Sequence, residues 1–290
     1  MRTAATCTLH VVDRPGDEPV IVFLHYFGGS SATWSRVVGR LSRYRCVAAD
    51  LRGFGESAAE TGRGYSMAEN ADDVARMIRR LDLRRYVLVG HSMGGKVAFA
   101  FAARRPPGLL SLVLVSPSPP SPEPMADVQR ARLLASWGDA RAAAETSRTI
   151  AAVPLDDAEI ALLVRDNLRS TLDAWRAWLE HGSREDLTAF FGDVTVPVWV
   201  VAGAADPVFP PPVLEATVVR PLARARMLVL PHVGHLAPLE APAELASVIA
   251  RSVASSTASR RSANEIGMAK KRKGRQKNEV LEQGMPRDRR

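Results

Sequence analysis

The first candidate for chemistry is Ser92, in the stretch GHSMGGKVA at residues 90–98. This serine has a glycine two positions away on either side and follows the apolar run at residues 86–89. A Gly-x-Ser-x-Gly turn between a strand and a helix exposes the serine hydroxyl, so the pattern favours a nucleophile. A serine that only caps the following helix is also compatible with it. The rest of the chain must therefore supply a base, an acid and a site for an oxyanion.

A base for this serine is sought among the six histidines, because imidazole titrates close to working pH. His232 and His235 lie in PHVGHLAPLE, directly after the last predicted strand, and loops that follow strands carry the sites of α/β proteins. His235 is preferred because Gly234 gives its loop the freedom to present the ring, and His232 is the alternative. The His-x-x-His spacing also suits a metal, but it lacks a helical context and carboxylates at ligand spacing. We predict neither a metal nor a cofactor.

An acid that orients the base is predicted at Asp206, in the stretch GAADPVFP that follows the strand expected at residues 196–203. An Asx turn before Pro207 explains the same aspartate without catalysis. The chain order Ser92, Asp206, His235 is the order that this strand–turn–helix architecture uses, and it favours the catalytic interpretation.

Acyl transfer also develops an oxyanion, which needs backbone N–H donors. One candidate donor is Met93, which directly follows the predicted nucleophile. The second is assigned to Phe27, in the loop HYFGG at residues 25–29. A glycine turn leading into a helix is equally compatible with that loop.

The elements that must position these residues alternate between strand and helix. Apolar runs rich in β-branched residues predict strands at 20–25, 45–50, 86–90, 109–116, 196–203 and 226–231. Such runs are typical of a parallel sheet that is covered on both faces. Helical spacing of apolar residues lies between them, and Ser66 with Glu69 forms a capping-box pattern at the start of one helix. The fold class is therefore α/β, with a mostly parallel sheet and helices on both faces.

The alternation stops after residue 116 with the proline-rich connector PSPPSPEP. The segment after this connector has helical patterns, including 156–168 and 170–181, and no convincing strand. We predict a core of residues 1–116 and 191–254, with a helical cap at residues 117–190. The Trp and Leu residues of the cap are interpreted as packing residues, although an insertion at this place overhangs the strand ends where ligands bind.

The net charge of +8 belongs mainly to the end of the chain. Residues 256–290 contain 11 Lys and Arg against four acids, a difference of +7, which leaves +1 for the remainder. We predict that the basic tail at 255–290 is disordered. Its run KKRKGRQK suits weak contact with a polyanion, and a solvated tail without a role is the alternative.

The composition of the whole chain, 290 residues of which 46% are hydrophobic, indicates an ordinary globular protein. No apolar run is long enough for a membrane span, and the N-terminus lacks the apolar segment of a signal peptide. Cys7 and Cys46 lie among apolar neighbours and are interpreted as buried free thiols. We therefore expect a cytoplasmic protein. Its oligomeric state is left open.

Five motifs in order, HYFGGS, DLRGFGES, GHSMGGKVA, GAADPVFP and GHLAPLE, resemble the α/β-hydrolase superfamily in its cap-containing, serine-nucleophile branch. The resemblance covers roughly residues 8–252. It implies Ser92, Asp206 and His235 as a triad, with Phe27 and Met93 as oxyanion donors. Within DLRGFGES, it implies supporting roles for an aspartate and an arginine, at positions 50 and 52.

Three departures from the family pattern bear on function. Tyr26 stands where many relatives have glycine, and it is a tentative substrate contact that narrows the acyl pocket. Gly28 stands where haloperoxidase and perhydrolase relatives usually have proline. The stretch before the first central strand is short, so we expect the initial antiparallel strands to be abbreviated.

These residues predict a serine hydrolase that cleaves a small ester or related acyl compound through an acyl-enzyme. The same triad also suits carbon–carbon bond hydrolysis, perhydrolysis or haloperoxidase-like chemistry, and acyl transfer. A different class of function, a ligand-binding protein with weak catalysis, is the remaining alternative. The substrate itself is not specified by these patterns.

Overall fold

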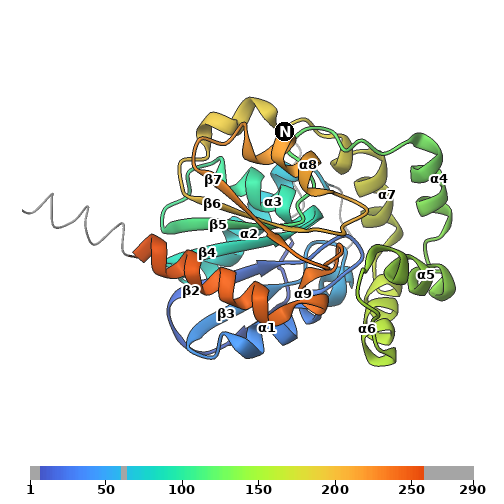
Figure 1. Cartoon of the computed structure of the whole chain (residues 1–290), viewed down its shortest axis with the longest axis horizontal. Coiled ribbons are helices and arrows are strands. Elements are labelled where there is room, and N and C mark those ends of the chain that lie inside the picture. Colours follow the sequence, from blue (N-terminus) through green and yellow to red (C-terminus); the bar gives the residue numbers. More distant parts are fainter. Residues whose placement is uncertain (1–6, 60–63, 258–290) are drawn as a thin grey trace, which may run out of the picture.

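The structure is a computed structural model, and it describes residues 7–59 and 64–257. Seven strands form one sheet in the order β1-β3-β2-β4-β5-β6-β7 (Figure 1). The strands are β1 Val11–Arg14, β2 Asp17–Leu24, β3 Tyr44–Ala49, β4 Tyr86–His91, β5 Leu109–Val115, β6 Val198–Gly203 and β7 Ala225–Leu230. All six predicted strands are present, with ends that differ by a few residues.

The first strand is the one that the apolar pattern does not predict. β1 pairs antiparallel with β3 at the edge of the sheet, whereas every other pair is parallel. Its four residues include Asp13 and Arg14 and are partly or fully exposed, so they lack the apolar run of a buried strand. This single short strand agrees with the expectation of an abbreviated antiparallel start.

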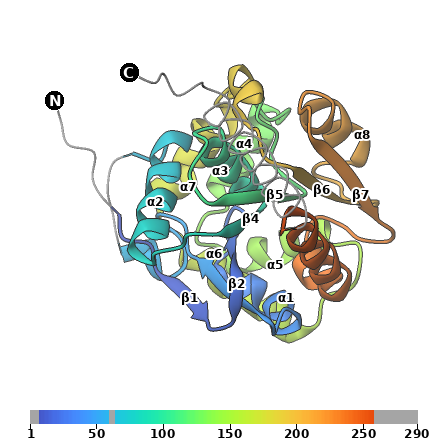
Figure 2. The ribbon, with the colours of Figure 1, turned by 90° about the vertical axis from the view of Figure 1, so that its left-hand side faces the viewer.

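Alternate residues of the central strands face two separate hydrophobic cores, because successive side chains of a strand point to opposite faces. In β2, Val22 and Leu24 belong to one core, and Ile21 and Phe23 belong to the other. Figure 2, together with Figure 1, shows helices on both sides of the sheet. The predicted arrangement of an α/β sheet covered on both faces is confirmed.

Each face is covered by its own set of helices. One core includes side chains of α2, α3 and α8, and the other includes side chains of α1 and a helix over residues 242–257. The covering helices are α1 Ser35–Arg40, α2 Met67–Arg80, α3 Met93–Ala102, α8 Pro211–Leu214 and α9 Ala237–Glu240. The predicted capping box is present at the start of α2, where Ser66 and Glu69 exchange hydrogen bonds with each other's backbone N–H.

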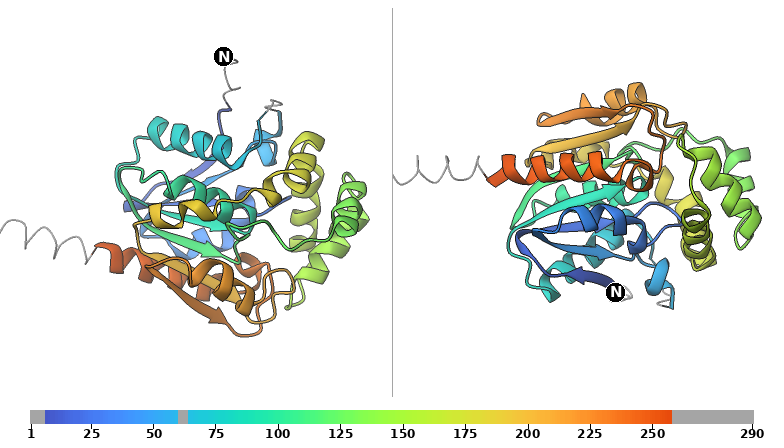
Figure 3. Two further views of the ribbon diagram at one scale, coloured as in Figure 1. Left: turned by 90° about the horizontal axis from the view of Figure 1, so that it is seen from above. Right: turned by 60° about the horizontal axis from the view of Figure 1, so that its bottom comes forward.

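Four more helices lie between β5 and β6 in the chain and stand together at one end of the sheet (Figure 1 and Figure 3). They are α4 Asp127–Ala135, α5 Ala140–Ile150, α6 Asp157–Leu168 and α7 Leu172–Glu180. α6 and α7 correspond to the two helical patterns predicted there. α4 packs on α7, and α5 packs on α6. We call residues 117–190, which contain these helices, the helical insertion.

The C-terminal tail largely falls outside the described residues, which end at 257. The last helix continues to residue 257, three residues past the boundary predicted for the core. The predictions for the basic segment beyond it concern residues outside the described ranges. Within the part of the chain that the structure describes, no helix combines the length and apolarity needed to cross a membrane. Cys7 and Cys46 are buried, as predicted, and neither forms a disulfide among the described residues.

Candidate active site

Ser92 lies at a sharp turn between β4 and α3. Its backbone has φ +51° and ψ −117°, a conformation that a non-glycine residue rarely adopts. Glycines make the turn possible, since a Cβ on Gly90 would lie 2.4 Å from the Gly94 carbonyl oxygen. The Ser92 side chain makes no hydrogen bond that caps the helix. The interpretation of this residue as an ordinary helix cap is therefore wrong.

The hydroxyl of Ser92 instead faces His235. Oγ of Ser92 lies 3.0 Å from His235 Nε2, and His235 Nδ1 lies 2.9 Å from Asp206 Oδ2. The three side chains come from the loops after β4, β6 and β7, at the same end of the parallel sheet. All three residues are buried. The alternative base, His232, is exposed and does not join this chain of hydrogen bonds.

Gly234 positions His235 for a different reason from the one that the sequence suggested. A Cβ at Gly234 would lie 2.5 Å from Ala152 N and 2.7 Å from the Ile150 carbonyl oxygen. The His235 N–H donates to that Ile150 oxygen at 2.8 Å. The glycine therefore permits close contact between the histidine loop and the end of α5. From the sequence, we expected this glycine to provide conformational freedom of the loop.

Asp206 serves the turn and the histidine at once. Its Oδ1 accepts hydrogen bonds from the N–H groups of Val208 and Phe209 at 2.8 and 3.0 Å, while Oδ2 faces His235. The Asx turn, the alternative explanation of this aspartate, is thus present together with the histidine contact. Burial by itself raises the pKa of Asp206, but the charge of His235 and these hydrogen bonds outweigh it and lower the pKa to about 2.

The two backbone groups predicted as oxyanion donors, those of Phe27 and Met93, flank the serine loop. Among the described residues, no carbonyl or side chain accepts a hydrogen bond from either N–H. The turn before Phe27 is held by His25, whose Nε2 accepts from the Leu51 N–H at 2.9 Å. Because Nε2 is an acceptor, Nδ1 of His25 carries the proton and donates to the backbone carbonyl oxygen of Tyr26 at 2.7 Å. His25 thereby fixes the loop that carries Phe27.

The aspartate and arginine of DLRGFGES lie beside this loop in structural roles. Asp50 accepts hydrogen bonds from the N–H groups of Ser31 and Glu56, at 2.6 and 2.9 Å. Arg52 forms a buried ion pair with Asp73, in which Nε donates at 2.7 Å. Neither side chain lines the cavity at Ser92.

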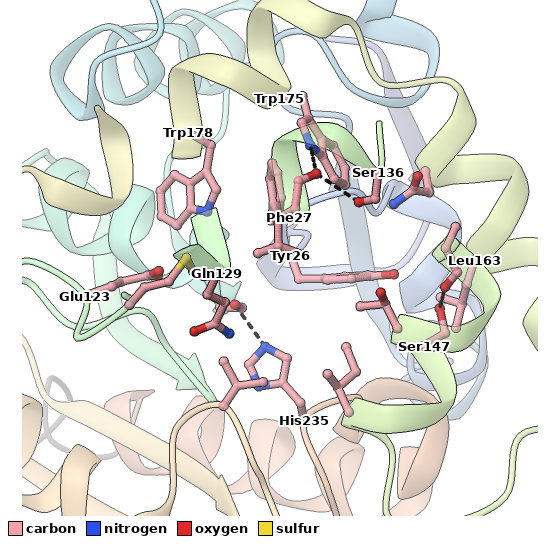
Figure 4. A pocket seen from close by; sticks show the side chains of 18 of the residues that line it. Tyr26, Phe27, Glu123, Gln129, Ser136, Ser147, Leu163, Trp175, Trp178 and His235 are labelled. Carbon is pink, nitrogen blue, oxygen red and sulfur yellow. Dashed lines mark hydrogen bonds between the residues drawn. The ribbon is translucent and has the colours of Figure 1, made fainter. Parts of the chain in front are cut away.

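A cavity of about 170 Å³ opens over Ser92 and His235 (Figure 4). Most of its lining is apolar, and Trp175 and Trp178 of the helical insertion contribute to it. The Trp175 ring packs on Phe27, with ring centroids 4.1 Å apart. The interpretation of these tryptophans as packing residues alone was therefore incomplete, because they pack and also line the cavity.

Tyr26, the tentative substrate contact, also lines this cavity. It is 8% exposed, and its ring lies 5.3 Å from that of His91. Burial, with a smaller contribution from the charge of Asp166, raises the pKa of the Tyr26 hydroxyl. The phenol thus stays neutral and can donate or accept a hydrogen bond.

Sequence reasoning missed a second group of polar residues near the serine. His91 is fully buried, and its Nε2 donates to the His235 carbonyl oxygen at 2.8 Å. Lys96 is fully buried in α3 and reaches the carbonyl oxygens of Ser121 and Ser183. Glu123 lies in the proline-rich connector and lines the cavity. The available signals were a lone lysine in an apolar helix and a lone acid between prolines.

The free energy of unfolding is expected to fall as the pH is lowered below about 6.5, and His91 should contribute to that loss. Burial, helped by repulsion from His235, lowers the pKa of His91 to about 3. The unfolded chain therefore binds one more proton than the native protein between these pH values. This difference destabilises the native state by up to about 1.4 kcal/mol for each pH unit.

Urea unfolding of a His91→Gln variant between pH 4 and 7 tests this expectation. The variant should show a shallower fall in unfolding free energy with decreasing pH than the wild type. His232→Gln is the matched control, because its exposed ring stays in contact with solvent in both states. Parallel pH profiles for His91→Gln and the wild type would contradict the assignment.

Comparisons with known proteins identify the relatives of this chain. A family profile described as "alpha/beta hydrolase fold" matches residues 19–155. A 2-(acetamidomethylene)succinate hydrolase of Mesorhizobium japonicum is 33% identical over 208 residues, which cover 68% of this chain and 74% of the relative. RutD of Variovorax paradoxus, a candidate carbamate hydrolase, is 30% identical over 241 residues, which cover 77% of this chain and 87% of RutD.

The fold of the chain is also similar to that of a solved structure. A thermophilic esterase from Thermogutta terrifontis has a TM-score of 0.72 and 27% sequence identity. The match covers 88% of this chain and 99% of the esterase. Sequence and structure therefore lead to one conclusion: the chain belongs to the α/β-hydrolase fold family, whose members include hydrolases and esterases.

Proposed function

We propose that the protein is a serine hydrolase that cleaves a small ester or related acyl compound through an acyl-enzyme. The observation that carries this proposal is the continuous hydrogen-bonded chain from Asp206 through His235 to Ser92, at the floor of a mainly apolar cavity. A serine becomes a strong nucleophile when a positioned imidazole accepts its proton, and the imidazole needs an acid to fix its tautomer. The relatives named for hydrolysis and the esterase structure support the same class of reaction.

In the proposed reaction, Ser92 Oγ attacks the carbonyl carbon and His235 Nε2 accepts the hydroxyl proton. The N–H groups of Phe27 and Met93 stabilise the oxyanion, which agrees with their lack of partners among the described residues. The protonated His235 then gives its proton to the leaving alcohol, and Asp206 stabilises the imidazolium. Water attacks the acyl-enzyme with His235 again as base, which releases the acid and restores Ser92.

The helical insertion is proposed to act as a cap that selects the substrate. The cavity of about 170 Å³ favours a small ester. Side chains of α4 to α7 line it opposite Ser92 and His235. Tyr26 is proposed as a contact on the acyl side, since its phenol lines the cavity beside the Phe27 loop.

Pre-steady-state hydrolysis of p-nitrophenyl acetate and butyrate tests the proposed function. The wild-type protein should release a burst of p-nitrophenol close to the concentration of active sites, because this good leaving group makes acylation faster than hydrolysis of the acyl-enzyme. A fluorophosphonate should add once, on the peptide that contains Ser92. Tight ligand binding with neither a burst nor an adduct would instead favour a weakly catalytic binding protein.

The same assay can separate the chemistries that share this triad. A panel with esters, a vinylogous diketone, peroxide with acetate, and an ester with a competing alcohol distinguishes ester hydrolysis from carbon–carbon cleavage, perhydrolysis and acyl transfer. We expect the largest kcat/KM for the esters. A diketone with a larger kcat/KM than every ester would assign the protein to carbon–carbon bond hydrolysis.

A further inference from the structure

Glu123 is a buried acid that faces the cavity and has no part in the proposed chemistry. Its residue is 8% exposed and lies in the connector between β5 and α4. In Figure 4 its carboxylate lies on the same side of His235 as Gln129, below the ring of Trp178. Ser147 and Leu163 lie on the other side of His235 (Figure 4). An acid in a mainly apolar cavity is costly unless a partner satisfies it.

Hydrogen bonds fix the backbone of Glu123 but leave its carboxylate open. The Glu123 N–H donates to the backbone carbonyl oxygen of Ser183 at 2.8 Å, and Arg130 Nη2 donates to the backbone carbonyl oxygen of Glu123 at 3.3 Å. Among the described residues, no cationic group lies within 4.0 Å of the Glu123 carboxylate. The hydroxyl of Ser118 is close to the carboxylate, yet it makes no hydrogen bond of normal geometry. The backbone contacts therefore hold at the cavity wall a carboxylate that has the Ser118 hydroxyl nearby and no ion-pair partner among the described residues.

Two nearby cations determine which ligand suits this carboxylate. Burial raises the pKa of Glu123, and the nearby Ser118 hydroxyl, followed by the charges of Lys96 and Arg130, opposes that rise without cancelling it. Both cations donate to backbone oxygens: Lys96 to those of Ser121 and Ser183, and Arg130 to that of Glu123. They oppose protonation of the Glu123 carboxyl group without contacting it, and its carbonyl oxygen can accept a hydrogen bond in either protonation state. They would also repel a substrate ammonium group, so the site suits a neutral hydrogen-bond donor.

We propose that Glu123 is a specificity residue that accepts a hydrogen bond from a neutral hydroxyl or amide N–H of the substrate. This inference rests on the proposed hydrolase function, and it adds the substrate class: small acyl compounds with a polar donor at one end of an apolar body. Trp178 and Met125, which line the cavity with Glu123, would cover the apolar part. A substrate without the donor would leave the buried carboxylate unsatisfied, and we expect such a substrate to react about 10- to 100-fold more slowly.

Two pairs of esters of matched shape test the proposal, because the donor can lie on the alcohol or on the acyl part. The first pair is 3-hydroxypropyl and butyl butyrate, and the second is methyl 4-hydroxyphenylacetate and methyl 4-methylphenylacetate. The wild type should prefer the hydroxylated ester of at least one pair by about 10- to 100-fold in kcat/KM. 3-Aminopropyl butyrate, with its ammonium group, should react more slowly than the hydroxypropyl ester.

Two variants connect the preference to this side chain. Glu123→Leu should abolish the preference for the hydroxylated ester, because kcat/KM for that ester should fall about 10- to 100-fold relative to the other ester of the pair. Glu123→Gln, which keeps the shape and one acceptor oxygen, should show an intermediate preference. Glu145→Gln on the exposed face of α5 is the matched control. A purely structural role would predict an equal loss for both esters of a pair.

These experiments distinguish failure of the proposed role of Glu123 from failure of the proposed hydrolase function. A wild type that hydrolyses all these esters without a hydroxyl preference, or that prefers the ammonium ester, overturns the role of Glu123 and leaves the serine hydrolase intact. A wild type with neither ester turnover nor a fluorophosphonate adduct overturns the hydrolase and the role of Glu123 with it. The wild-type comparison needs no variant, so it decides the question even if the substitutions at Glu123 prevent folding.

Discussion

Ser92→Ala is expected to lower kcat for p-nitrophenyl esters by about 10⁵-fold or more and to abolish labelling by a fluorophosphonate. The Ser92 hydroxyl is the group that His235 Nε2 contacts at 3.0 Å, and no covalent acyl-enzyme can form without it. The remaining donors and His235 can assist only a direct attack by water. Steady-state kinetics and the mass of the intact protein after labelling measure both effects.

Ser42→Ala is the matched control for this experiment, because Ser42 is exposed and has no part in the cavity. It should retain wild-type turnover and a single adduct. The Ser92→Ala variant should keep a melting temperature close to that of the wild type, since alanine tolerates the same backbone angles as serine. Undiminished labelling of Ser92→Ala would refute the assignment of the nucleophile.

The sheet and the three central residues of the site were predictable because each depends on short stretches of sequence. Parallel strands buried on both faces leave continuous apolar runs. A nucleophile turn needs glycines at fixed offsets, which GHSMGG provides. The candidate acid and base follow strands directly, and the carboxyl ends of parallel strands meet at one edge of the sheet. The juxtaposition of Ser92, Asp206 and His235 therefore follows from local patterns and chain order.

The wall of the cavity was not predictable, because it depends on packing between distant segments. Trp175 meets Phe27 across nearly 150 residues of sequence, and no local pattern encodes that contact. The role of Gly234 was misread for the same reason, since its crowding comes from α5. His91 lies within GHSMGG, and only the structure shows its hydrogen bond to the backbone carbonyl oxygen of His235. The residues that line the cavity could therefore be identified only from the structure.

Asp206→Asn is expected to lower kcat by about 10⁴-fold at neutral pH with little change in KM, because it reverses the histidine tautomer. Oδ1 of Asp206 accepts from two backbone N–H groups, so the carbonyl oxygen of an asparagine must occupy that position. Its NH₂ group then faces His235 Nδ1, which has to become the acceptor. The ring proton moves to Nε2 and points at Ser92, where the imidazole can no longer accept the hydroxyl proton.

Steady-state kinetics of Asp206→Asn beside Asp157→Asn, an exposed aspartate of α6, test this argument. The control should keep wild-type kcat, and both variants should fold, since the turn at residue 206 retains its acceptor oxygen. Truncation to Asp206→Ala removes that acceptor as well and should also destabilise the turn. A selective loss in kcat for the asparagine variant is the effect that orientation of His235 predicts. A loss of less than tenfold would mean that the carboxylate serves the turn alone, and the proposed triad would reduce to Ser92 and His235.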